Sequence, residues 1–288
     1  MLSLGLIVAF GAMLSFAASD FMAKKSSSRL GSKRATLMLF VSSLLTLIVG
    51  AGFFGLSKIN YTMMAFSIAA GLVYVVAYFL MYKSLETEQV ANTISLAGIE
   101  YALITVLGIV VLRESVTGTE VVSFFAVFIG AFLATTTKKL RFNKSYAPAA
   151  LGMALFAVTY MLLVFATQSS GGVFAPLIVR QSISLAAILV WLRVLPEKGK
   201  RFKNVRLGKV GYPMLVVAAL VGVFNGTGSL FLLLLTQFSF VAVGSAIVAT
   251  EAAVIVFLGY LIYRERFERH QVIGFVLLVL GTIALSIA

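Results

Sequence analysis

Two glutamates within apolar runs are the residues of this sequence whose type and position most clearly suggest chemistry. Glu100 and Glu251 each lie near the middle of a long apolar run, and their positions differ by 151 residues. A carboxylate at a bilayer centre costs about 2.5–3.5 kcal/mol, so both side chains are expected to face protein or water. Burial favours the protonated form of a carboxyl group, which makes both glutamates candidates for substrate binding or proton coupling. The alternative is a structural pair that holds helices together.

A third candidate is Arg180, which lies in another apolar run beside Gln181. An arginine keeps its charge, so it needs a carboxylate, a set of carbonyl groups or an anionic ligand. The functional interpretation is recognition of a substrate carboxylate or phosphate. The structural alternative is that Arg180 reaches the near membrane surface or pairs with Glu100 or Glu251.

Aromatic and amide side chains complete the set of candidate substrate-binding residues. They are Tyr74, Tyr78, Asn92, Tyr101 and Tyr160, and we expect them to line a cavity for an aromatic or zwitterionic substrate. The alternative is that each of them makes a helix contact or lies at the membrane interface.

A glycine-rich stretch, 222–228, contains the further candidate Asn225. Gly222 and Gly226 form a GxxxG pattern, which is typical of close helix packing. The alternative is local unwinding that presents Asn225 and backbone carbonyls to a cavity. A shift of 151 residues pairs this stretch with Gly71 and Tyr74, so the two segments are expected to face each other.

Asp20 ends the first apolar run, close to a basic segment. We expect it to pair with Lys24 or Lys25 at the membrane interface rather than to bind a coupling ion. The run before it, 2–18, has no basic segment ahead of it, so we interpret it as a retained first span and not as a cleaved signal peptide.

The composition shows which class of protein must position these residues. The chain has 288 residues, of which 61% are hydrophobic and 11% charged, with a mean hydropathy of +1.06. Soluble domains have about 25% charged residues, so this composition indicates a membrane protein. With no cysteine and one histidine, His270, the sequence offers no disulfide and no multi-histidine metal centre.

Helical spans of about 20 apolar residues fit ten segments, and strand-type alternation is absent. We therefore predict an all-α membrane protein with ten transmembrane helices. Pro148, Pro176 and Pro213 fall in or near first turns, where a proline is tolerated. The spans are 3–22, 35–56, 62–82, 90–112, 117–136, 148–167, 173–195, 210–234, 240–262 and 270–287.

The stretch 92–134 recurs near the C-terminus after a shift of 151 residues, without a gap. Glu100 falls on Glu251, Gly108 on Gly259, and the pair Arg113-Glu114 falls on Arg264-Glu265. Such a shared spacing indicates a duplication. We predict two five-helix repeats, 1–143 and 144–288.

Basic residues are distributed unequally between the two predicted faces. Loops that follow the odd-numbered spans contain 20 of the 23 Lys and Arg residues. By the positive-inside rule these loops are cytoplasmic and both termini lie outside a cell membrane. An odd number of spans per repeat also inverts the second repeat relative to the first, as in many transporters.

These motifs resemble those of EamA-type members of the drug/metabolite transporter superfamily. Segments 95–114 and 246–265 are similar to that family's fourth-helix signature, and Arg180 with the small residues after it is similar to its second-helix motif. Departures are Phe40 in place of that arginine in the first repeat, and Tyr101 and Ala252 where the family has proline. The resemblance implies a transport fold with a central cavity, and it does not identify the substrate.

We therefore expect a secondary transporter, working as an exporter, for a small polar or amphipathic metabolite such as an amino acid. Alternating access around a central cavity between the repeats is the expected mechanism. Two alternatives stay open, namely a transporter of an organic cation or drug and a lipid-acting intramembrane protein. The sequence has no phosphate-binding loop, so ATP is not expected to drive transport directly. With one histidine and few acidic residues, neither an enzymatic activity nor a cofactor is expected. The expected partners are a small-molecule substrate and the lipid bilayer, with a homodimer left open and no nucleic acid.

Overall fold

The structure is a computed structural model that describes residues 2–87, 97–136, 146–194, 212–238, 240–263 and 268–287. Every regular element within these ranges is helical, as predicted. The elements are α1 (Leu2–Leu30), α2 (Ser32–Phe54), α3 (Tyr61–Thr87), α5 (Ala97–Val111), α6 (Gly118–Thr135), α7 (Tyr146–Ser170), α8 (Phe174–Val194), α9 (Tyr212–Leu234), the 3-10 turn η2 (Leu235–Phe238), α10 (Val241–Val248), α11 (Glu251–Tyr263) and α12 (Arg269–Ile287).

Nine segments of the described chain are long and apolar enough to cross a membrane, and a shorter apolar helix, Gly98–Val111, accompanies them. The helices expose apolar side chains and bury polar ones, as a lipid environment requires. Large apolar side chains such as Phe125 and Ile273 are exposed, whereas Arg180, Asn225 and Glu251 are buried. Because hydrocarbon cannot solvate polar groups, this arrangement is that of a multi-pass membrane protein.

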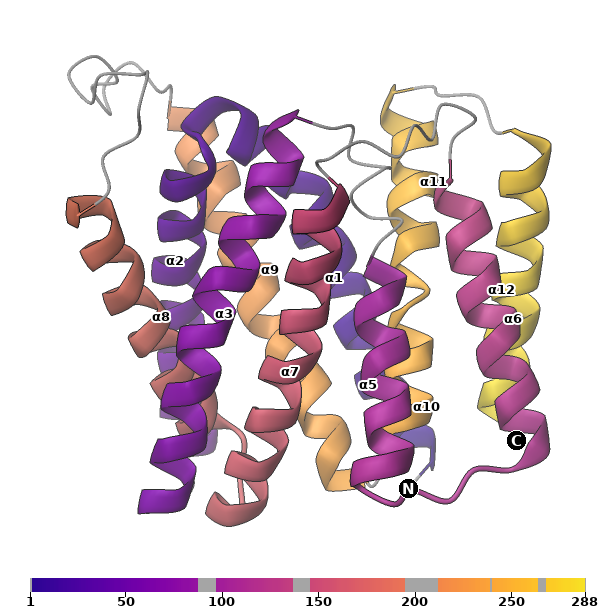
Figure 1. Cartoon of the computed structure of the whole chain (residues 1–288), viewed down its shortest axis with the longest axis horizontal. Coiled ribbons are helices and arrows are strands. Elements are labelled where there is room, and N and C mark those ends of the chain that lie inside the picture. The colour runs from indigo at the N-terminus through magenta and orange to yellow at the C-terminus, as the bar shows by residue number, and fades with distance from the viewer. Residues whose placement is uncertain are drawn as a thin grey trace.

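The helices form one bundle in which α6 and α12 lie side by side at one edge and α2 and α8 lie at the other (Figure 1). Helices α1, α5, α7 and α9 occupy the middle. The first residues of α1 and the last residues of α12 lie at the same end of the bundle (Figure 1).

Helix boundaries follow local chain chemistry. Gly31 and Gly55 adopt φ angles of 80° and 84°, a region that favours glycine, and they separate α2 from its neighbours. Pro148, Pro176 and Pro213 lie within the first three residues of α7, α8 and α9, as predicted.

The ninth predicted span is not one continuous helix, because it is interrupted between α10 and α11. The Thr250 hydroxyl donates to the carbonyl oxygen of Ile247 at 2.7 Å, and the Thr250 amide donates to the same oxygen at 3.0 Å. The amide bond spans three residues where an α-helical bond spans four, so the turn at Thr250 is tighter than an α-helical turn. The interruption makes Glu251 the first residue of α11, where the helix dipole favours a negative charge.

Glycines allow close helix contact at two places. In α9, a Cβ atom on Gly222 would meet the Leu39 carbonyl oxygen and Ser42 of α2, and one on Gly226 would lie 3.1 Å from the Ser43 carbonyl oxygen. The predicted packing role of this pair is confirmed. The alternative of local unwinding is wrong, because α9 runs unbroken through both glycines.

The second close contact joins α6 to α12. A Cβ atom on Gly130 would lie 2.6 Å from the Leu278 backbone nitrogen, and one on Gly274 would lie 2.7 Å from the Gly130 carbonyl oxygen. Both obstacles are backbone atoms, which cannot move aside without separating the two helices.

Substitution of Gly274 by valine is therefore expected to lower the thermal unfolding temperature in detergent. Overpacking typically costs about 1–3 kcal/mol, and the rigid backbone obstacle here favours the upper part of that range. Gly52→Val is the matched control, since a Cβ atom there would meet nothing within 4 Å. Equal melting temperatures for the two variants would contradict the close approach of α6 to α12.

Candidate functional site

A polar cavity of about 50 Å³ lies in the middle of the bundle. Seven helices contribute to it, three from the first half of the chain and four from the second. The residues that line it are Phe16, Asp20, Tyr74, Tyr78, Met81, Glu100, Tyr101, Met153, Phe156, Thr159, Tyr160, Leu163, Arg180, Ser229, Leu232, Leu233 and Glu251.

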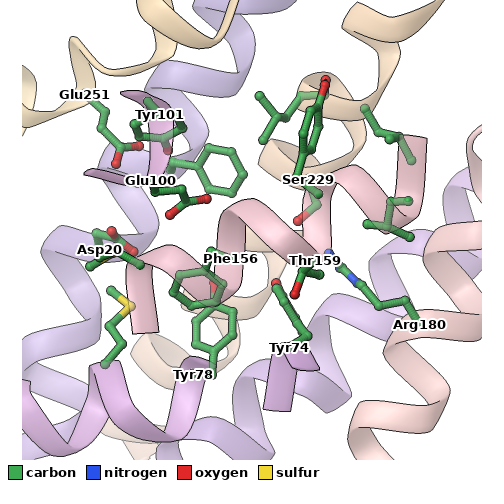
Figure 2. Close-up of a pocket in the computed structure, with 17 residues that line it drawn as sticks. Asp20, Tyr74, Tyr78, Glu100, Tyr101, Phe156, Thr159, Arg180, Ser229 and Glu251 are labelled. Atoms are coloured by element: carbon green, nitrogen blue, oxygen red, sulfur yellow. The ribbon is translucent and has the colours of Figure 1, made fainter. Parts of the chain in front are cut away.

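Three carboxylates gather on one side of this cavity (Figure 2). They are Asp20 of α1, Glu100 of α5 and Glu251 of α11, and they are close enough to interact electrostatically. The Tyr101 hydroxyl donates a hydrogen bond to the Glu251 carboxylate. Glu251 is 2% exposed, and its Oε2 has no hydrogen-bond partner in the described part of the chain.

Arg180 lies on the other side, away from the three carboxylates (Figure 2). It is 2% exposed, so it does not reach the membrane surface. Its Nη2 donates to Gln181 Oε1 at 3.0 Å, and its guanidinium carbon lies 4.0 Å from the centre of the Tyr74 ring. Among the described residues its Nε has no partner, and no carboxylate pairs with it. The structural alternatives of a surface-reaching or acid-paired Arg180 therefore do not describe this site.

Aromatic rings form the wall between the two charged sides. The rings of Tyr74 and Tyr78 pack edge to face with their centroids 4.7 Å apart, and the centroids of Phe156 and Tyr78 are separated by the same distance. Asn225 holds the two tyrosines from behind, because the Tyr74 hydroxyl donates to its Oδ1 at 2.9 Å and its Nδ2 donates to the Tyr78 hydroxyl. These paired polar groups fix the positions of the two tyrosines in the cavity wall.

The structure brings most of the predicted site residues together. Asn225 lies one layer behind the cavity, in contact with two of its tyrosines. Asn92 falls outside the residues that the structure describes. The predicted residues that line the cavity are Tyr74, Tyr78, Glu100, Tyr101, Tyr160, Arg180 and Glu251.

The sequence predicts Asp20 at the membrane interface, and the structure instead places it in the cavity wall. The first apolar run ends near Asp20, but α1 continues to Leu30. Ser26 and Ser27 are buried in this last part of α1 and mark it as packed helix. The sequence gives no signal of this continuation, because serine favours turns and helix ends. Thr159 and Ser229, which also line the cavity, are likewise not distinguished by the sequence.

A larger space of about 530 Å³ lies near the ends of α5, α7, α9 and α10. Val164 lines this outer space, whereas its neighbour Leu163 lines the central cavity. The Tyr160 hydroxyl donates to the Leu232 carbonyl oxygen at 3.0 Å and ties α7 to α9 between the two spaces. Tyr160, which lines the central cavity, is thus held one helical turn from Val164, which lines the outer space.

Glu114, which also lines the outer space, fixes the beginning of α10. Its two carboxylate oxygens accept from the backbone amides of Val241 at 2.9 Å and Ala242 at 2.7 Å. Neighbouring Arg113 has a φ of 57°, the one positive value for a non-glycine residue in the described chain. A strained backbone at this point presents Glu114 to α10.

Glu114→Ala is expected to lower the unfolding temperature, because it leaves two amides at a helix start without an acceptor. Hydrogen bonds to charged groups contribute about 1.5–3 kcal/mol each. Glu114→Gln retains one carbonyl acceptor and should fall between the alanine variant and the wild type. If all three proteins melt together in detergent, Glu114 does not hold α10.

His270 lies outside the central cavity. Its Nε2 is 2.7 Å from the Thr136 carbonyl oxygen, and its Nδ1 is 3.4 Å from Glu268. These contacts join the start of α12 to the end of α6. Within the described residues, no group of three acidic, histidine or cysteine side chains is arranged to hold a metal ion.

Comparison with known proteins supports the helical fold described above. A crystal structure of another protein, 16% identical in sequence, superposes with a TM-score of 0.74 over 98% of this chain and 96% of that one, which shows a shared fold. No curated protein sequence matches the chain significantly. Residues 3–136 match the model of the EamA-like transporter family. Residues 3–136 of this chain therefore match a family of membrane transporters that belongs to the drug/metabolite transporter superfamily.

Proposed function

We propose that this protein is a secondary transporter that exports a small polar or amphipathic metabolite, such as an amino acid, by alternating access. The observation that carries the proposal is the central cavity, which unites Arg180, three carboxylates and an aromatic wall from both halves of the chain. The substrate anion would bind Arg180, whose Nε has no partner among the described residues. A buried arginine of this kind suits the planar geometry of a carboxylate.

Two inverted five-helix repeats, 1–143 and 144–288, are part of this proposal, and the helix contacts support them. The shift of 151 residues relates α3 to α9, α5 to α10–α11 and α6 to α12, and the order of the helices along the chain then pairs α1 with α7 and α2 with α8. A two-fold axis requires contacts to occur in exchanged pairs. Helix α3 packs on α7 as α1 packs on α9, and α2 packs on α9 as α3 packs on α8.

Equivalent residues also meet near the centre, as such an axis requires. Tyr74 and Asn225 are 151 residues apart and are joined by a hydrogen bond of 2.9 Å. Glu100 and Glu251, separated by the same interval, interact electrostatically. Contact between equivalent positions is expected only close to a symmetry axis, so the axis would run beside the cavity.

The cavity volume supports a conformational cycle. A space of about 50 Å³ holds one or two waters, whereas small-molecule sites usually occupy about 300–1,000 Å³. The described conformation is therefore too closed for a bound metabolite. Opening toward the outer space would separate the Tyr160–Leu232 contact.

The proposed orientation places the basic loops in the cytoplasm and both termini outside. The α5–α6 connection and the start of α12 lie at opposite ends of the bundle (Figure 1). Since the chain has no cysteine, Ser115→Cys and Arg269→Cys each introduce one label site. In intact cells an impermeant maleimide should label the first and spare the second until the cells are lysed. Labelling of both from outside would overturn the inverted topology.

The three carboxylates favour one second candidate, a transporter of organic cations. Their formal charge exceeds that of Arg180, so a ligand with a positive group and no anion also suits part of the cavity. Such a transporter would bind cationic ligands no more weakly after Arg180 is replaced by methionine. A transporter of amphipathic carboxylates would lose its ligand.

A further inference from the structure

We propose that the Asp20 carboxylate is the binding subsite for a primary ammonium group of the substrate, on the side of the cavity opposite Arg180. The cavity would then select zwitterions that place a carboxylate at Arg180 and an ammonium group at Asp20. This inference rests on the transport function proposed above and names a residue that determines its specificity.

Asp20 is the member of the acidic group best suited to contact a ligand. It is half-buried, lines the cavity and has no hydrogen bond with any side chain that the structure describes. The preceding residue fixes its place, because the Ser19 hydroxyl donates to the Val221 carbonyl oxygen of α9 at 3.1 Å. This bond holds α1 to α9 at the level of the cavity, so Asp20 presents its carboxylate from a fixed turn.

Glu251 provides an independent indication that a ligand belongs on this side. One of its oxygens, Oε2, is buried and has no partner within the described residues. Leaving a polar group buried without a partner costs about 1–3 kcal/mol, and more if the group is charged. A positively charged donor that bridges Asp20 and Glu251 would remove that cost for Glu251 and would pair the charge of Asp20.

The residues that line the cavity favour an organic ammonium group as the cation that binds at Asp20. No described group of acidic side chains is arranged to ligate a metal ion. Phe16 and Phe156 line the cavity beside Asp20, and aromatic faces attract ammonium groups. The Arg180 guanidinium already covers one face of the Tyr74 ring, so a substrate ammonium group would not bind there. The proposed ammonium site is therefore on the side of the cavity that holds the carboxylates.

The two charged sides together define a zwitterion. Figure 2 shows Asp20 and Arg180 on opposite sides of the aromatic wall. Arg180 Nε and Glu251 Oε2 are both buried and both lack partners in the described chain. A ligand whose anionic and cationic groups reach both sides of the cavity would satisfy both atoms at once, which neither charge alone can do.

The test uses two sets of matched probes with the purified full-length protein in detergent. One set is L-phenylalanine, 2-phenylethylamine and 3-phenylpropanoate, and the other is L-leucine, 3-methylbutylamine and 4-methylpentanoate. Members of a set share an apolar frame and differ only in the charged groups. Apparent affinities are measured by thermal-shift titration and by isothermal calorimetry.

For at least one frame, the zwitterion should bind the wild type most tightly. Asp20→Asn should weaken binding of the zwitterion and the amine at least tenfold and leave the carboxylate probe within twofold. Asp20→Glu, which restores the charge, should recover amine binding. Glu268→Gln removes a carboxylate outside the cavity and should bind all probes as the wild type does.

Each contrary result has a distinct meaning. If the wild type binds zwitterions and Asp20→Asn binds them equally well, the Asp20 subsite is overturned while the proposed function stands. If Asp20→Asn loses the carboxylate probe as strongly as the amine, Asp20 does not select ammonium and the inference is likewise overturned. If no probe of either set binds the wild type, the proposed substrate class fails and this inference with it.

Discussion

Arg180→Met is expected to lower transport of the zwitterionic substrate by about 100-fold without loss of thermal stability. A carboxylate bound to both edges of the guanidinium would lose charge-assisted hydrogen bonds that contribute about 1.5–3 kcal/mol each. A loss of about 3 kcal/mol corresponds to a factor of about 100. Arg180→Lys keeps the positive charge but loses the planar arrangement of N–H donors, so its transport rate should lie between those of the wild type and Arg180→Met.

The expected stability separates substrate binding from a structural role. Arg180 is buried without an acidic partner among the described residues, and desolvation of such a charge opposes folding. Replacement by an apolar side chain of similar length should therefore leave the unfolding temperature unchanged or raise it. A variant that unfolds early would indicate that Arg180 holds α8 in place instead.

Counterflow into liposomes measures the transport effect, with the L-phenylalanine or L-leucine probe that binds the wild type. Arg193→Met is the matched control, because Arg193 lies exposed at the end of the same helix. Transport by Arg180→Met within a factor of three of the wild type would remove Arg180 from the substrate site.

Glu100→Gln combined with Glu251→Gln is expected to abolish the response of transport to a proton gradient. Both side chains line the cavity and interact with each other electrostatically, so a proton gained by either changes the charge that the substrate meets. Glutamine has nearly the same shape but no proton to exchange. The double variant should still exchange substrate for substrate, because that process needs no net proton movement, but with weaker substrate binding, because Glu251 also faces the proposed ammonium subsite.

An imposed gradient of one pH unit stores about 1.4 kcal/mol per proton, which corresponds to about tenfold accumulation of substrate. Proteoliposomes of the wild type should show that accumulation and those of the double variant should show none. Glu120→Gln is a suitable control, since Glu120 caps α6 beside Thr117 and lies outside the central cavity. Wild-type transport that ignores the gradient, together with full transport by the double variant, would exclude proton coupling through these residues.

The sequence alone sufficed to predict which described segments are apolar enough to span a membrane, and approximately where most of them begin and end. Lipid requires long uninterrupted apolar helices, and this requirement acts on each segment separately. Proline and glycine positions likewise act locally, so the starts of α7, α8 and α9 were predictable. The interruption before Glu251 was not, because a single threonine that bonds back to the helix leaves no distinct pattern in an apolar run.

The identity of the polar residues in the spans was also readable, since charges within lipid are costly and rare. This reasoning found Glu100, Arg180 and Glu251. It misplaced Asp20, because the apolar run ends there while the helix continues for ten more residues. Apolarity and helix length are different quantities, and only packing against α9 shows that Asp20 lies inside the bundle.

What the sequence determined by itself is therefore the set of helices, their membrane environment and the inventory of side chains that lipid cannot solvate. Which of these side chains share a cavity was decided by the tertiary structure. Rotation and spacing of the helices depend on contacts between distant segments, such as Gly222 against Leu39 and Tyr74 against Asn225. Because those contacts form only when all helices pack together, the separation of Arg180 from the three carboxylates is a property of the assembled bundle.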